Sequence, residues 1–284
     1  MRLSLDSTFY LGRTERKMAV KRCRTTTICC LPEDCLANVF ALTTPKDVCR
    51  FSAVASTFRS AADSDGVWER FLPSDYRDII SRSIDGPDSL LRQVQSKKDL
   101  YLRLSDHPII IDSGLKSFKL DKGSGKKCYM LPARDLYIVW GDKRRYWLWA
   151  SHTKTSFSDV AQLRNVCWFE IVCSINTNML SFDTNYAAYL VFKIKSGRYE
   201  FYNQPAEVCG GIKGLEVEKD SFYLENNTEL LKLREDGWME VELGEYFVKG
   251  GEDDTEMSLL EMKGLRSKSD LVIQGVEIRP KECT

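Results

Sequence analysis

Apolar residues follow a helical period at the start of the patterned part of the chain. Leu36, Val39 and Phe40 lie at the i, i+3 and i+4 spacing of one helix face. Leu31-Pro32-Glu33-Asp34 stands directly before them, and proline and acidic side chains both suit the first turn of a helix. We therefore predict a helix that ends before Thr43-Thr44-Pro45.

Two more short helices are predicted within residues 31–76. Pro45 can begin the second helix, with Val48, Phe51, Ala55 and Phe58 on one face. The third would carry Trp68 and Phe71 and end at Pro73. Such short helices are marginal alone, and fewer than about fifty residues make a thin core. Either this bundle packs against the rest of the chain, or another protein completes its apolar face.

Residues 77–112 are interpreted as a helical connector. Gly86-Pro87 marks a break, after which one amphipathic helix is expected from Ser89 through Leu104. We expect this connector to pack between the two parts of the chain and to fix their orientation.

From about residue 109 the pattern is typical of strands. Apolar runs at 167–172 and 186–194, and alternating patterns at 136–140, 239–243 and 271–278, are separated by turn residues. Gly275 indicates a bulge in the last strand. The predicted fold class is therefore α+β multidomain, with a small helical unit followed by an antiparallel, jelly-roll-like β-sandwich over residues 113–284.

Three tryptophans gather within ARDLYIVWGDKRRYWLWASH, residues 133–152. This stretch is interpreted as a hairpin, with strands at 135–140 and 145–150 around a turn at 141–144. Trp147 and Trp149 would then share one face. They can be core residues, or an indole can form an aromatic platform for a sugar ring, with hydrogen bonds from Asp142, Arg144 and Arg145.

Composition narrows the possible partners. The formal charge of the 284-residue chain is zero, which gives no general drive toward nucleic acid or anionic membranes. No run approaches the ~20 apolar residues of a membrane span, so we predict no membrane insertion, and the start lacks a secretory signal. The ten cysteines include no C-x-x-C pair, and free thiols are expected. Residues 1–30 are interpreted as a flexible basic tail.

Signs of enzyme chemistry are weak. His107 and His152 have no metal-ligand spacing around them. The run at residues 122–127, KGSGKK, lacks the first glycine of a phosphate loop, because position 120 is leucine, and is better interpreted as a basic turn. We therefore predict a protein that is not an enzyme, with no metal and no cofactor.

Residues 31–76, LPEDCLANVFALTTPKDVCRFSAVASTFRSAADSDGVWERFLPSDY, resemble an F-box. This resemblance implies binding to a Skp-type adaptor and, through it, to a cullin and ubiquitin-conjugating machinery. The expected adaptor-binding residues are Leu31, Pro32, Leu36, Val39, Phe40 and Trp68.

The motifs ARDLYIVWGDKRRYWLW, NVCWFEI, YAAYLVFKI, DGWMEVELGEYF and VIQGVEIRP resemble the phloem lectin family (phloem protein 2 type, including the tobacco agglutinin-like domain) from about residue 113 to 280. That resemblance implies a β-sandwich that binds N-acetylglucosamine oligomers or N-glycan cores. It also implies two sugar-site tryptophans in a W-x6-W arrangement, here Trp140 and Trp147, and leaves Trp149 as scaffold. Residues 141–145 between them are more basic than the family pattern.

Together the two resemblances imply a substrate-recognition subunit of a Skp–cullin–F-box ubiquitin ligase that captures a glycoprotein in the cytoplasm or nucleus. In the alternative hypothesis, the F-box is kept and the sandwich is a protein-binding surface without sugar binding. A third hypothesis is a stand-alone lectin whose helices only support the sandwich.

Overall fold

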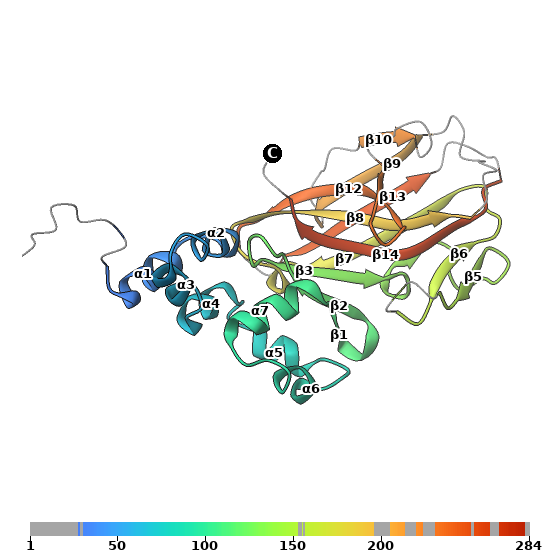
Figure 1. Cartoon of the computed structure of the whole chain (residues 1–284). Helices are drawn as coiled ribbons and strands as arrows, with labels where there is room; N and C mark the ends of the chain where they lie inside the picture. The colour runs from blue at the N-terminus through green and yellow to red at the C-terminus, as the bar shows by residue number, and fades with distance from the viewer. Residues whose placement is uncertain are drawn as a thin grey trace, which may run out of the picture.

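The computed structural model describes residues 28, 31–152, 155, 157–195, 205–213, 220–223, 231–250, 253–261 and 267–281. Seven helices come first in this part of the chain, and the strands follow them (Figure 1). The predicted α+β class is confirmed. Apart from residue 28, the predicted tail at residues 1–30 lies outside the described residues.

Four short helices form the helical module: α1 Glu33–Phe40, α2 Pro45–Phe51, α3 Ser56–Ala62 and α4 Asp65–Phe71. The single helix expected from Pro45 through Phe58 is wrong, because the chain leaves the helix after Phe51 and is extended at Ala55. This break lets two rings surround Phe40. The ring of Phe51 stacks on it at 5.1 Å, and that of Phe58 meets it edge-on at 5.5 Å. Packing around one aromatic side chain outweighs the continuous helical pattern.

Three helices follow in the connector: α5 Tyr76–Ser81, α6 Pro87–Leu91 and α7 Lys97–Asp106. The single helix predicted from Ser89 through Leu104 is therefore wrong. Ser96 begins α7 instead, since its hydroxyl accepts a hydrogen bond from the Asp99 backbone N–H at 3.0 Å. The next N–H, of Lys97, donates to the Asp65 carboxylate of α4 at 2.8 Å. A side-chain cap and a contact with another helix together fix the new start.

The remaining chain forms two antiparallel sheets, which confirms the predicted sandwich. The nine-stranded large sheet contains β1 Ile109–Ile111, β2 Lys116–Leu120, β3 Lys127–Pro132, β14 Leu271–Pro280, β8 Thr184–Ile194, β12 Met239–Val248, β11 Lys232–Leu233, β5 Trp147–Ala150 and β6 Val160–Leu163. The five-stranded small sheet contains β10 Asp220–Tyr223, β9 Pro205–Ile212, β13 Asp254–Glu261, β7 Phe169–Asn176 and β4 Tyr137–Ile138.

One continuous apolar core runs from the helical module into the space between the sheets. In β7, Phe169, Ile171, Cys173 and Ile175 are buried, and the residues between them are not, as strand alternation requires. Trp68 of α4 and Phe118 of β2 belong to the same core. The helices therefore do not have to be stable alone.

The contact between helices and sandwich centres on the turn at residues 121–126, which overlaps the basic run at residues 122–127. The hydroxyl of Tyr101, in α7, donates to the backbone carbonyl of Asp121 at 3.0 Å, and its ring packs on Trp68 at 5.1 Å. Gly125 has a φ of +74°, and a Cβ there would lie 2.8 Å from the Phe71 carbonyl oxygen. This basic turn is thus a structural joint.

Gly275 lies at the bulge predicted in β14. The pairing of β14 with β8 shifts register between Ile273 and Gly275, which confirms the bulge. A Cβ at Gly275 would lie 1.9 Å from the backbone oxygen of Leu131 on β3. Because the neighbouring backbone cannot move away easily, no other residue fits without separating the two strands.

We expect Gly275→Ala to lower the free energy of unfolding by at least about 2 kcal/mol, because strained backbone sites give large losses. Gly123→Ala is the matched control: its added Cβ would lie 3.5 Å from the Asp121 side chain, and its loss should stay within about 0.5 kcal/mol. Urea denaturation of both variants measures the difference. Equal losses would contradict the close approach of β3 and β14.

Candidate functional site

Three of the six expected adaptor-binding residues are buried. Leu36 and Phe40 face the core of the helical module, and Trp68 is 1% exposed. The indole N–H of Trp68 donates to the Ala62 carbonyl at 2.6 Å. These three side chains shape the module from inside and have almost no surface for a partner to touch.

The other three expected residues, Leu31, Pro32 and Val39, are exposed. Leu42, one turn after Val39, is 78% exposed and was missed in the sequence because it lies beyond the predicted helix face. Leu42 lies in the turn that follows α1, where its backbone N–H donates to the Val39 carbonyl at 3.1 Å, so Val39 and Leu42 are close neighbours at this end of the helix. We call Leu31, Pro32, Val39 and Leu42 the α1 apolar surface. Figure 1 shows α1 at the end of the molecule, away from the sheets.

The tryptophan stretch is not a hairpin, contrary to the prediction. β4 pairs with β7 in the small sheet, and β5 pairs with β6 in the large sheet. Between them the chain crosses from one sheet to the other, and Trp140 takes a left-handed conformation with a φ of +55°. The backbone N–H of Gly141 bonds to the Ile138 carbonyl at 2.8 Å and closes the turn. Pairing with distant strands determined this outcome, and local alternation does not reveal it.

Trp147 is fully buried between the sheets. Its indole N–H donates to the Val139 carbonyl at 3.0 Å. Trp149 shares that face, as alternation predicted, but it is only partly buried, with the Arg134 guanidinium 3.8 Å from its ring centre. Trp147 is therefore the better covered of the two, and in this structure its ring has no surface on which a sugar can stack.

Trp140 is half-buried and belongs to a group of three rings. Its ring centre lies 4.7 Å from that of Trp168 and 5.1 Å from that of Tyr146. Trp168 and Tyr146 are also partly buried. We call Trp140, Tyr146 and Trp168 the aromatic cluster. Trp168 was missed as a site residue because it lies just before β7, far from Trp140 in the sequence, and the pairing of β4 with β7 brings the two together.

A network of charged side chains covers part of the outer face of the large sheet. Glu277 of β14 accepts from Lys119 of β2 at 2.7 Å and also contacts Arg234. Arg234 reaches Glu240 of β12 at 2.8 Å, and Arg279 bonds to both glutamates. This network ties together strands that are not neighbours in the sheet.

Glu277 is 4% exposed, yet it is charged. Burial by itself raises the pKa of this carboxyl, but the charges of Lys119, Arg234 and Arg279 outweigh that effect and lower its pKa to about 2. The pKa of Glu240 is also lowered: burial raises it, and hydrogen bonds from Arg279 and Arg234 more than compensate. The network therefore stabilises the fold most when both glutamates are ionised.

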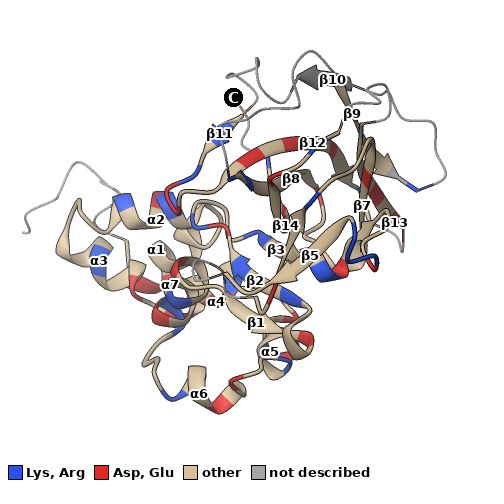
Figure 2. Cartoon of the chain, turned by 90° about the vertical axis from the view of Figure 1, so that its right-hand side faces the viewer, with Lys and Arg blue, Asp and Glu red and all other residues tan. Residues whose placement is uncertain are grey.

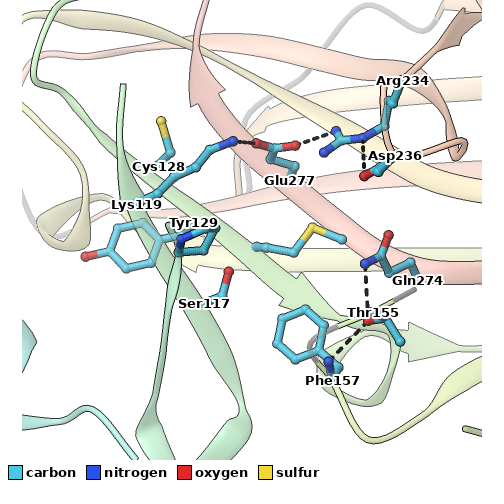
Figure 3. A pocket seen from close by; sticks show the side chains of 12 residues that line it. Ser117, Lys119, Cys128, Tyr129, Thr155, Phe157, Arg234, Asp236, Gln274 and Glu277 are labelled. Atoms are coloured by element: carbon cyan, nitrogen blue, oxygen red, sulfur yellow. Dashed lines mark hydrogen bonds and ion pairs between the residues drawn. The ribbon is translucent and has the colours of Figure 1, made fainter. Parts of the chain in front are cut away.

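A pocket of about 380 Å³ opens beside this network (Figure 3). Lys119, Glu277, Arg234 and Asp236 follow one another along one side. Thr155, Phe157 and Gln274 lie on another side, where the Thr155 hydroxyl accepts from Gln274 at 3.2 Å and from the Phe157 N–H at 3.1 Å. We call this the outer-face pocket. It was missed in the sequence because its residues come from six separate segments.

Among the described residues, no three His, Cys, Asp or Glu side chains gather in a group suited to hold a metal ion. None of the helices in that part of the chain combines the length and apolar character that a membrane crossing requires.

Comparisons with known proteins match both parts of the chain. The F-box domain family matches residues 28–70, and the phloem protein 2 family matches residues 126–280. F-box protein PP2-B10 of Arabidopsis thaliana is 44% identical over 259 residues, which cover 88% of this chain and 92% of that protein. F-box protein VBF of the same plant is 39% identical over 283 residues, which cover 88% and 99%.

Solved structures are more distant. The match to the Podospora anserina GH26-CBM35 β-(1,4)-mannanase has a TM-score of 0.33 and 8% identity, and it covers 55% of this chain and 28% of that chain. A likeness at this level adds nothing to the functional argument.

The charge network gives a prediction for pH dependence. Because the pKa of Glu277 is lower in the folded state, its contribution to stability is complete above its ordinary value of 4.5 and is lost as the pH falls toward about 2. We expect Glu277→Gln to lower the unfolding free energy at pH 7 by about 3 kcal/mol and to flatten its pH dependence between those two values.

Glu242→Gln is the control, since Glu242 pairs with Lys281 but is 32% exposed. Urea denaturation at several pH values measures both variants. If Glu277→Gln keeps the pH slope of the original protein, the network does not hold Glu277 ionised.

Proposed function

The chain belongs to the F-box proteins that carry a phloem protein 2 domain, and we propose that it acts as a substrate receptor of a Skp–cullin–F-box ubiquitin ligase. In this role the helical module binds a Skp-type adaptor, which connects it to a cullin. The lectin-like sandwich captures the target, a glycoprotein with N-acetylglucosamine-type glycans. We place this activity in the cytoplasm and nucleus, and the chain itself performs no catalytic step.

The observation that carries the adaptor part is the α1 apolar surface. Leu42 is 78% exposed and Val39 is 42% exposed. A module this small has few apolar side chains with which to build its own core, so two that stay exposed need another explanation. Neighbouring exposed apolar side chains are typical of protein interaction sites. Buried Leu36, Phe40 and Trp68 support this surface from below by holding α1 against α3 and α4.

The joint at residues 121–126 supports the ligase part of the proposal. Lys127 of β3 pairs with Asp75, just before α5, at 2.9 Å and is 8% exposed at its side chain. With Tyr101 and Gly125, this pair holds the sandwich at a fixed position relative to the adaptor surface. A receptor of this kind works by proximity, because it brings target lysines near a conjugating enzyme and lowers the entropic barrier to transfer.

The glycan part of the proposal rests on the aromatic cluster. The face of an indole matches the C–H face of a pyranose ring, and Trp140 is the partly accessible member of the predicted tryptophan pair. We propose that Trp140 contacts the sugar and that Trp147, buried behind it and bonded to Val139, fixes the turn that presents Trp140.

The burial of Trp147 also favours the second candidate function. With one member of the pair inside the core and Trp149 covered by Arg134, less aromatic surface is open than two free indoles would offer. In that alternative the sandwich binds a protein surface directly, and no sugar is involved.

The adaptor proposal predicts that Val39→Asp and Leu42→Asp each weaken binding of a purified Skp-type adaptor at least about tenfold, about 1.4 kcal/mol. Both side chains are exposed, so thermal unfolding should change little. Leu91→Asp is the control, because Leu91 is 46% exposed on α6, in the connector. Calorimetric titration measures all three. Equal weakening by Leu91→Asp would argue against α1 as the docking surface.

The glycan proposal predicts different effects of the same change at two tryptophans. Trp140→Leu should weaken chitotriose binding at least about tenfold, with a small loss of stability. Trp147→Leu should cost about 3 kcal/mol of unfolding free energy, because it leaves a cavity and an unpaired Val139 carbonyl. Titration and urea denaturation test the pair. A folded protein that binds no chitotriose would favour the protein-binding alternative.

A further inference from the structure

The outer-face pocket lies on the side of the large sheet opposite the main core. Trp147 and its strand partner Leu163 belong to the core between the sheets. Trp238, Val160, Val191 and Val272 form a separate buried cluster, with Met130 packed against it. Met130 also lines the pocket. The pocket is therefore built on a packed second layer, and it does not belong to the aromatic cluster around Trp140.

The charges that line the pocket cancel. Lys119 and Arg234 supply two positive charges, and Asp236 and Glu277 supply two negative charges. Each cation is already paired, since Lys119 contacts Glu277 at 2.7 Å and Arg234 contacts Asp236 at 3.3 Å. An anion would have to compete with these carboxylates. The arrangement favours a neutral ligand that forms many hydrogen bonds. The wider surface agrees, because acidic and basic side chains are interspersed over the sheets (Figure 2).

Hydrogen-bonding capacity remains at the pocket wall after the internal contacts are counted. Toward the described residues, Lys119 uses one of its three N–H donors, on Glu277. Within the described part of the chain, the Gln274 amide oxygen and the Ser117 hydroxyl have no hydrogen-bond partner, although Ser117 is largely buried at 8% exposure. Both donors and acceptors therefore remain available in the pocket, as hydroxyl groups of a sugar require.

An aromatic side chain supplies the other half of such a site. Phe157 lines the pocket and is 8% exposed, and Figure 3 shows it beside Thr155 and Gln274. The part of its ring that stays open can contact the C–H side of a pyranose. Tyr129 also lines the pocket, but its ring packs on Phe118 in the main core. The volume of about 380 Å³ falls in the range of roughly 300–1,000 Å³ for small-molecule sites.

We propose that the outer-face pocket is a second saccharide-binding site, which holds a neutral sugar residue by Lys119, Ser117 and Gln274 with Phe157 as an apolar wall. This site is independent of the aromatic cluster. The proposal rests on the proposed lectin function, and the experiment below distinguishes binding at this pocket from binding at the aromatic cluster.

The test uses the full chain, isotope-labelled, and follows backbone amide signals during titration with chitotriose, mannotriose and xylotriose. Inorganic phosphate serves as the anionic probe. Ser117→Leu fills the pocket, and Ser117→Ala removes only the hydroxyl. Gln274→Ala removes one hydrogen-bonding group without adding bulk. It replaces Ser117→Leu in the comparison if Ser117→Leu lowers the thermal stability. Trp140→Leu reports on the other site.

We expect at least one trisaccharide to shift the signals of Lys119 and Gln274. Ser117→Leu should weaken that binding at least about tenfold. Ser117→Ala, which loses only the hydroxyl, should weaken it less, and Trp140→Leu should leave it within about twofold. The proposal is overturned if no trisaccharide shifts these signals, if Ser117→Leu binds as well as the original protein, or if phosphate binds more tightly than every sugar. If Trp140→Leu is the only variant that loses chitotriose binding, the sugar binds at the aromatic cluster and the outer-face pocket is not a saccharide site.

Discussion

The contact between Tyr101 and the turn at residues 121–126 holds the whole arrangement together. Tyr101 places its ring on Trp68 of the helical module and its hydroxyl on the Asp121 carbonyl of the sandwich. Gly125 allows the turn to lie against the Phe71 carbonyl, where a side chain would clash. Short helices that would be marginal alone share a core with the sandwich in this way. The α1 apolar surface and the sandwich are therefore parts of one body.

Much of this fold is readable from local pattern. The start of α1 follows from Pro32, Glu33 and Asp34, and the long run of β8 is apolar because nearly all of it is buried. The bulge at Gly275 follows from one glycine that interrupts an alternating strand. In each case the residues that determine the structure are adjacent in the chain, so their pattern is sufficient.

The wrong predictions occur where contacts between residues distant in the sequence determine the structure. Helices expected to continue past Phe51 and past Leu91 stop because packing around Phe40 and a contact with Asp65 take precedence. The tryptophan hairpin fails because β4 and β5 pair in different sheets. Trp168 and the outer-face pocket could not be found for the same reason, since their residues meet only after the sheets form. Burial of Trp147 is the most consequential result, because it changes what the tryptophan pair can do.

Scanning calorimetry of the full chain tests the shared core most directly. If the helical module and the sandwich are one cooperative unit, heating will give a single transition whose calorimetric enthalpy equals its van't Hoff enthalpy. Two separate transitions, or a helical signal lost well before the sandwich unfolds, would contradict the account, because the module would then be an independent domain joined by a loose connection.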